Sequence, residues 1–150
     1  MISFAPCANL AVYPGSTALG YDGYTIEQHT PGPEHFTFRK NLFELGLFLT
    51  KDQQRGCRTS GHKIRRAFTD KPTANICLLH HLQRRDIGHL IPENWKKRLL
   101  FGWGTLYRSC HSSRLFVPYL FWSRRNGWQV DMECLDVEFL PDDMALLFRI

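Results

Sequence analysis

The hydrophobic and polar positions near the C-terminus alternate in a pattern that predicts a β-hairpin. Residues 115–123 and 128–140 are rich in aromatic and β-branched side chains, and a polar segment separates them. That segment ends in Asn126-Gly127, the residue pair that a two-residue type I′ turn prefers. We therefore expect residues 115–140 to form an antiparallel hairpin.

The position of this turn sets the expected register of the hairpin. With Asn126-Gly127 at the centre, Phe121 lies opposite Met132 on the facing strand. Pro118 has no N–H to donate to a neighbouring strand. The first strand of the hairpin is therefore predicted to lie at an edge of its sheet.

The middle of the chain shows the spacing of amphipathic helices. In the longest predicted helix, residues 33–51, apolar side chains recur every three to four residues. Ser60 is expected to cap a short helix that runs to Phe68. Two more helices are expected to begin near Pro72 and Pro92, because proline is well tolerated in the first turn of a helix.

The first 32 residues favour short strands and turns. Strands are expected over Leu10–Tyr13 and Tyr24–His29, and Asp22-Gly23 is a turn signal. The whole pattern predicts an α+β fold. We expect a single compact domain of residues 1–150, with helices in the middle, strands at both ends and an antiparallel hairpin at the C-terminus.

The charged residues are segregated along the chain. Residues 1–38 carry a net charge of −3, residues 39–125 carry +13 and residues 126–150 carry −5, within a total of +5. A concentrated positive field attracts polyanions. The acidic alternation near the C-terminus is expected to be the solvated face of a strand.

Aromatic residues are interleaved with the basic ones, as in Trp122, Arg124, Arg125 and Trp128. Guanidinium groups bind phosphates with forked geometry, and aromatic rings stack on unpaired bases. This pattern predicts that the basic middle binds nucleic acid or an acidic protein surface. The residues expected to carry that binding are Arg58, Lys63, Arg65, Arg66, Arg84, Arg85, Lys96, Lys97, Arg124 and Arg125.

A second hypothesis comes from three short segments. His80-His81, Asn94 and Cys110-His111 follow one another in an order that resembles the HNH nuclease signature. The resemblance implies that one of the first histidines activates water and that Asn94 braces the loop. It also implies that His111 helps to hold a divalent metal ion. The resemblance covers residues 79–111, and the interval from Asn94 to His111 is longer than in that signature.

No cofactor is expected, and a metal ion is expected only under the nuclease hypothesis. The five cysteines form no CxxC pair, which structural zinc sites prefer. Their odd number predicts free thiols in a reducing, cytoplasmic environment. The longest apolar run, Leu115 to Trp122, is far shorter than the ~18 residues of a membrane-spanning helix, so no membrane partner is expected.

The leading functional hypothesis is a small, non-enzymatic intracellular protein. It would bind nucleic acid, or a complex that handles nucleic acid, as a regulator or inhibitor. The alternatives are an HNH-like metal-dependent nuclease and an inhibitor or immunity-type protein-interaction module. A basic surface suits both binding hypotheses, so the sequence leaves them open.

Overall fold

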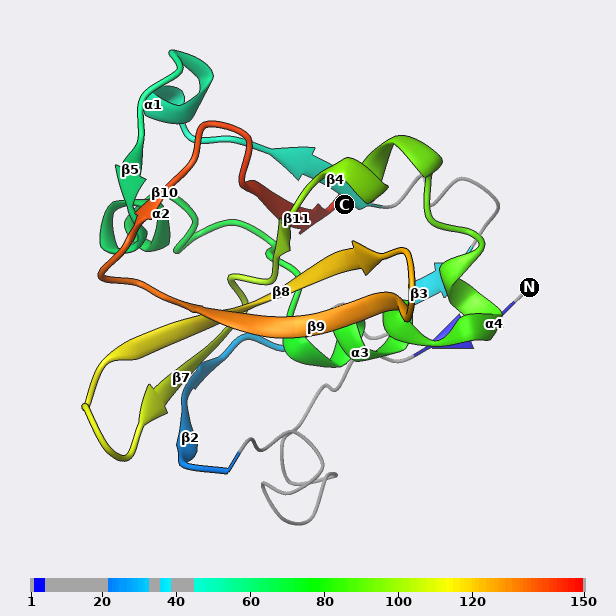
Figure 1. Cartoon of the computed structure of the whole chain (residues 1–150), viewed down its shortest axis with the longest axis horizontal. Coiled ribbons are helices and arrows are strands. Elements are labelled where there is room, and N and C mark those ends of the chain that lie inside the picture. The colour runs from blue at the N-terminus through cyan, green and yellow to red at the C-terminus, as the bar shows by residue number, and fades with distance from the viewer. Residues whose placement is uncertain (1, 5–21, 33–35, 39–44, 150) are drawn as a thin grey trace.

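A computed structural model of the chain describes residues 2–4, 22–32, 36–38 and 45–149 (Figure 1). Most strands belong to one mixed sheet of seven strands, in which β2, β7, β8, β6, β11 and β4 are successive neighbours and β9 pairs with the other edge of β8. The strands are β1 (Ile2–Phe4), β2 (Tyr24–His29), β3 (Phe36–Phe38), β4 (Leu45–Phe48), β5 (Thr59–Ser60), β6 (Leu100–Phe101), β7 (Thr105–Ser109), β8 (Leu115–Ser123), β9 (Gly127–Cys134), β10 (Glu138–Phe139) and β11 (Met144–Phe148). The helices are α1 (Lys51–Gln54), α2 (Gly61–Ala67), α3 (Ile76–Gln83), α4 (Arg85–Gly88) and the 3₁₀ helix η2 (Glu93–Lys97).

The strand β8 lies at the centre of the sheet, so the prediction of an edge strand is wrong. One edge of β8 pairs with β9, and the other edge is shared by β7 and β6. The Pro118 carbonyl accepts a hydrogen bond of 2.9 Å from the Gly102 N–H. The nitrogen of Pro118 faces the same side as its carbonyl. The missing N–H therefore falls at the junction between β6 and β7, and the ladder to β9 loses no hydrogen bond there.

The strands β8 and β9 form the predicted hairpin, but its predicted extent and register are wrong. The hairpin ends at Cys134 and not at residue 140, because Glu138–Phe139 pairs with β5 instead of β8. Phe121 pairs with Gln129 and not with Met132, a difference of three residues. A type I′ turn needs positive φ at both central residues. Gly127 has a φ of +77°, whereas among the described residues Ser113 is the only non-glycine with positive φ. Asn126 therefore does not adopt the type I′ conformation. The strands are joined by a longer turn, residues 124–126, between the paired Ser123 and Gly127.

The predicted helix over residues 33–51 is also wrong. Residues 36–38 form β3, and Leu45–Phe48 forms β4, which pairs antiparallel with β11. Leu45 and Leu47 contact the core at the two-residue spacing of a strand. A strand forms here because β11, almost a hundred residues further along the chain, supplies its hydrogen-bonding partner. Short-range periodicity contains no information about such a partner.

The helix predicted to begin near Pro92 is only one short 3₁₀ segment. Beyond η2 the chain forms β6, a turn through Gly102 and Gly104, and then β7. The Gly104 N–H donates a 2.8 Å hydrogen bond to the Ala74 carbonyl. A Cβ at Gly104 would lie 2.8 Å from that same oxygen. Close backbone approach therefore replaces the predicted helix with a turn that packs on residues 73–74.

Two other local predictions are confirmed. Ser60 caps α2, its side chain accepting from the Lys63 N–H, and Phe68 follows as the C-cap. The strand β2 spans the predicted Tyr24–His29. The helix near Pro72 begins later than predicted, after the N-cap Asn75. The predicted strand at Leu10–Tyr13 lies outside the described residues.

Two hydrophobic clusters form on opposite faces of the sheet. On one face, α3 and α4 pack against β8 and β9, and Leu78, Leu82 and Trp128 are buried there. On the other face, Ile64 of α2 joins Phe101 and Phe139. The fold is therefore dominated by a seven-stranded sheet with short helices on it. The predicted plan, with helices filling the middle and a separate two-stranded hairpin at the end, is wrong.

Candidate functional site

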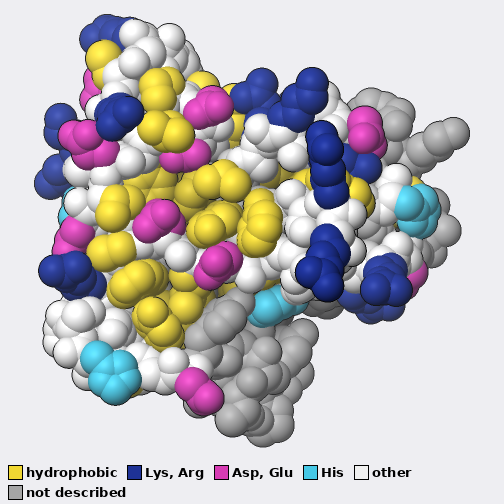
Figure 2. Space-filling model, in the orientation of Figure 1, with side chains coloured by type: hydrophobic (Ala, Val, Ile, Leu, Met, Phe, Trp, Pro, Cys, Tyr) yellow, Lys and Arg dark blue, Asp and Glu magenta, His cyan; other side chains and the backbone are white. Residues whose placement is uncertain are grey.

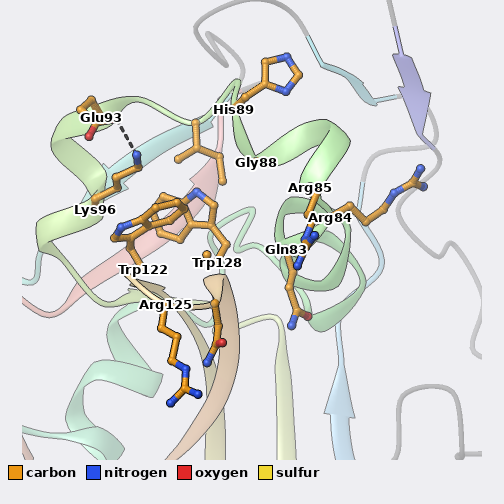
Figure 3. Close-up of a pocket in the computed structure, with 13 residues that line it drawn as sticks. Gln83, Arg84, Arg85, Gly88, His89, Glu93, Lys96, Trp122, Arg125 and Trp128 are labelled. Carbon is orange, nitrogen blue, oxygen red and sulfur yellow. Dashed lines mark ion pairs between the residues drawn. The ribbon is translucent and has the colours of Figure 1, made fainter.

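A pocket of about 520 Å³ opens where the α3–α4 junction, η2 and the β8–β9 turn meet (Figure 3). We call it the cationic pocket. Its basic side chains come from three separate segments, namely Arg84 and Arg85 at the α3–α4 junction, Lys96 of η2, and Arg125 of the β8–β9 turn. The indoles of Trp122 and Trp128 also line it. A volume of this size lies in the range of small-ligand sites.

The two indoles form the centre of the cationic pocket. Their rings meet edge to face, with centroids 5.5 Å apart. They come from residues that are paired directly across β8 and β9, so the observed register of the hairpin places them together. The Lys96 ammonium lies 4.0 Å from the Trp122 ring centroid, in a cation–π contact.

The indole N–H of Trp128 is a buried donor with no hydrogen-bond partner among the described residues. The Trp128 side chain is only 3% exposed. A Cβ at Gly88 would lie 2.9 Å from Cδ1 of this ring, so the absence of a side chain lets α4 close over it. An unpaired buried donor is costly, and here it lies in the wall of a pocket.

The carboxylates at the cationic pocket neutralise only part of its positive charge. Arg84 forms two hydrogen bonds with Asp86, at 3.0 and 2.7 Å, and Lys96 forms an ion pair with Glu93 at 2.8 Å. The Arg84 contact, through its hydrogen bonds, lowers the pKa of Asp86. Within the described part of the chain, Arg85 has no carboxylate partner.

The cationic groups surround the two indoles and do not point at one atom. In Figure 3 the Lys96 ammonium turns toward Glu93, whereas the Arg125 guanidinium extends away from the rings. Arg125 also has no carboxylate partner among the described residues. Charges spread in this way match a chain of several phosphates better than one small anion.

The ten basic residues predicted to bind nucleic acid do not form one patch. Four of them line the cationic pocket, Arg124 belongs to the same turn as Arg125, and Lys97 lines a neighbouring hollow. The other four, Arg58, Lys63, Arg65 and Arg66, lie on or before α2. Figure 2 shows Lys and Arg side chains on the α4 side and also along the opposite edge, on the side of α1 and α2, with acidic groups among hydrophobic side chains over β8 and β9.

Two further residues of the cationic pocket, Gln83 and His89, were not predicted from the sequence. No periodicity or motif marks these two residues, because they join the pocket only through the positions of α3 and α4. The sequence feature that could have indicated this pocket is the interleaving of Trp122 and Trp128 with the arginines of the turn between them.

The residues of the nuclease hypothesis lie in different surroundings. His81 is buried in α3, His80 contacts Gln83 through a 3.3 Å hydrogen bond, and Asn94 is exposed on η2. His111 is exposed in the turn between β7 and β8, which Figure 1 places at the far end of the sheet from α4. Among the described residues, no group of three His, Cys, Asp or Glu side chains is arranged to hold a metal ion.

The prediction that all cysteines are free thiols is wrong for Cys77. Cys77 is disulfide-bonded, whereas Cys57 and Cys110 are exposed free thiols and Cys134 is a buried one. Cys77 belongs to α3 and packs in the core cluster beneath the sheet.

We expect His81 to make the stability of the fold depend on pH. Burial lowers the pKa of His81 below its ordinary value of 6.5, Arg84 lowers it further, and Asp86 opposes both effects. Below pH 6.5 the unfolded chain takes up a proton that the folded chain resists, so stability is expected to fall as the pH falls through this range. Urea unfolding at about pH 7.5, 6.5 and 5.5 measures this loss.

The matched variants for this prediction are His81→Gln and His111→Gln. We expect His81→Gln to flatten the pH dependence, whatever its effect on stability at neutral pH, and His111→Gln to leave the dependence unchanged. A slope of stability against pH that is the same in His81→Gln as in the original protein would contradict the prediction.

Comparison with known proteins identifies no relative: no family model matches the chain, and no curated protein or solved structure is significantly similar to it. In the part of the chain that the structure describes, no helix is both long enough and apolar enough to cross a lipid bilayer.

Proposed function

We propose that the protein binds single-stranded nucleic acid through the cationic pocket. One observation carries this proposal: four basic side chains from three separate segments line the same hollow as two indoles. Proteins that hold single strands combine positive charge along the backbone path with aromatic rings near the bases. The proposal implies that the protein has a binding role, and that by occupying a strand it would regulate or inhibit other factors.

The charge balance at the cationic pocket supports a polyanionic ligand. Arg85 and Arg125 have no carboxylate partner among the described residues, and both are exposed. Bringing like charges together has an electrostatic cost that a bound polyanion removes. The half-buried Trp122 contributes an aromatic surface to the same pocket.

We expect the affinity for single-stranded nucleic acid to fall steeply with salt. If all four basic residues contact phosphates, log K should change with log salt by about −2.8 on a single strand, and by about −3.6 on a duplex. Fluorescence anisotropy of a labelled oligonucleotide, titrated between about 50 and 200 mM salt, measures the slope.

The same titration separates nucleic acid from a protein partner. Failure to bind any DNA or RNA oligonucleotide at about 50 mM salt, where the electrostatic attraction is strong, would contradict the proposal. That result would favour an acidic protein surface as the ligand of the cationic pocket.

A further inference from the structure

A second pocket, of about 500 Å³, lies apart from the cationic pocket. It is formed by the end of β4, by α1, by β5 and by α2; Figure 1 shows α1, β5 and α2 together at one corner of the molecule. We call it the α1–α2 pocket. It shares no lining residue with the cationic pocket.

The α1–α2 pocket has a large apolar wall. Phe48, Leu49, Ala67 and Phe68 contribute to this wall. The Phe48 ring is 40% exposed, which makes it one of the few large hydrophobic side chains left open to water among the described residues. An aromatic ring kept partly in water has a free-energy cost that an apolar ligand recovers by covering it.

The same pocket carries an excess of positive charge. Lys51, Lys63 and Lys71 line it together with a single acid, Asp52. None of these three lysines forms an ion pair with a carboxylate in the described part of the chain. The lysines are therefore available to an anion from outside the chain.

The buried hydroxyl of Thr59 adds a polar group to the lining of this pocket. Thr59 is 5% exposed, and its Oγ1 has no hydrogen-bond partner among the described residues. The buried Gln53 of α1, by contrast, is satisfied: its side chain donates to the carbonyls of Leu140 and Asp143 at 3.0 and 2.9 Å. The unsatisfied hydroxyl of Thr59 therefore points to a missing partner.

We propose that the α1–α2 pocket binds a small amphiphilic carboxylate. The apolar body of the ligand packs on Phe48 and Phe68, and its carboxylate lies against the lysine ammonium groups. The Thr59 hydroxyl donates a hydrogen bond to the ligand. Lysine presents a compact charge on a flexible stem, which suits a single anionic head better than the forked arginines of the cationic pocket do.

The test uses the full chain and three probes of one chain length: octanoate, 1-octanol and octylamine. We expect octanoate to bind with a Kd below about 1 mM by calorimetry, 1-octanol to bind more weakly, and octylamine not to bind. Lys63→Gln and Lys71→Gln should each weaken octanoate binding about two- to fivefold, the range for exposed ion pairs. The matched control, Lys97→Gln on η2, should have no effect.

Two further variants make the outcome decisive. Ala67→Trp should fill the pocket and abolish octanoate binding, because Ala67 is an exposed residue at the end of α2 that lines this pocket. Thr59→Val should weaken octanoate binding without lowering stability, since it removes an unpaired polar atom. Equal affinity for octanoate and 1-octanol, or unchanged octanoate affinity in all these variants, would overturn the proposal. Neither result bears on nucleic-acid binding at the cationic pocket.

Discussion

Replacing Arg85 and Arg125 together with glutamine is expected to weaken binding of single-stranded nucleic acid about 100-fold at low salt. Each charge-assisted hydrogen bond to a phosphate contributes about 1.5 kcal/mol, so losing two corresponds to about 3 kcal/mol. The salt slope should also become shallower by about 1.4, because two phosphate contacts are lost. Fluorescence anisotropy measures both quantities.

The fold should tolerate this double substitution. Both arginines are exposed, and neither has a carboxylate partner among the described residues. Exposed charges contribute little to folding. The thermal midpoint of the double variant should therefore match that of the original protein, which confines the effect to binding.

The matched control is the double variant Arg58→Gln, Arg66→Gln, which removes the same net charge near α2. We expect its affinity to fall only a few-fold, through the weaker long-range field. If the two double variants lose affinity equally, binding depends on total charge and the cationic pocket has no special role.

Replacing Asn75 with alanine is expected to lower the free energy of unfolding by about 3 kcal/mol. Asn75 is fully buried, and its amide has two roles. Its oxygen accepts from the Leu78 N–H at 3.1 Å and caps α3, while its nitrogen donates to the Thr30 carbonyl at 3.1 Å. Loss of the cap costs about 1 kcal/mol, and a buried polar group left without a partner costs about 1–3 kcal/mol more.

Urea unfolding of two further variants tests these roles. Asn75→Asp keeps an acceptor for the helix cap, but when ionised it cannot donate to Thr30 and it also buries a charge, so it should lower stability at neutral pH as well. Asn94→Ala removes an exposed asparagine with no side-chain hydrogen bond within the described structure, and should change stability by less than about 0.5 kcal/mol. An effect of Asn75→Ala as small as that of Asn94→Ala would contradict the assigned role of the amide.

Hydrogen bonds to residues distant in sequence hold the start of α3 in place. Besides the bond from Asn75 to Thr30, the Thr105 hydroxyl accepts from the Ile76 N–H at 3.0 Å and contacts His29 at 2.9 Å. The first turn of α3 is therefore bonded to the ends of both β2 and β7. The sequence predicted a helix near these residues, but its anchor is formed by partners about 30 and 45 residues away.

The charge pattern shows the same limit of sequence reasoning. The basic middle was evident, and it contains every basic side chain of the cationic pocket. Which of those residues meet could not be predicted, because α2 carries Arg65 and Arg66 to a different corner from α4. The Arg65 guanidinium donates a 3.1 Å hydrogen bond to the side-chain oxygen of Gln28, and Arg65 does not line the cationic pocket.

The sequence by itself determined the local features of this protein: the Ser60 cap of α2, the strand Tyr24–His29, and a hairpin that became β8 and β9. These depend on neighbours within a few residues, whose types and spacing are visible in the chain. Only the tertiary structure decided that Leu45–Phe48 is a strand and that β8 lies centrally. It also brought Trp122 and Trp128 together among the arginines. Each of these needs a partner distant in sequence, and burial against that partner outweighs local propensity.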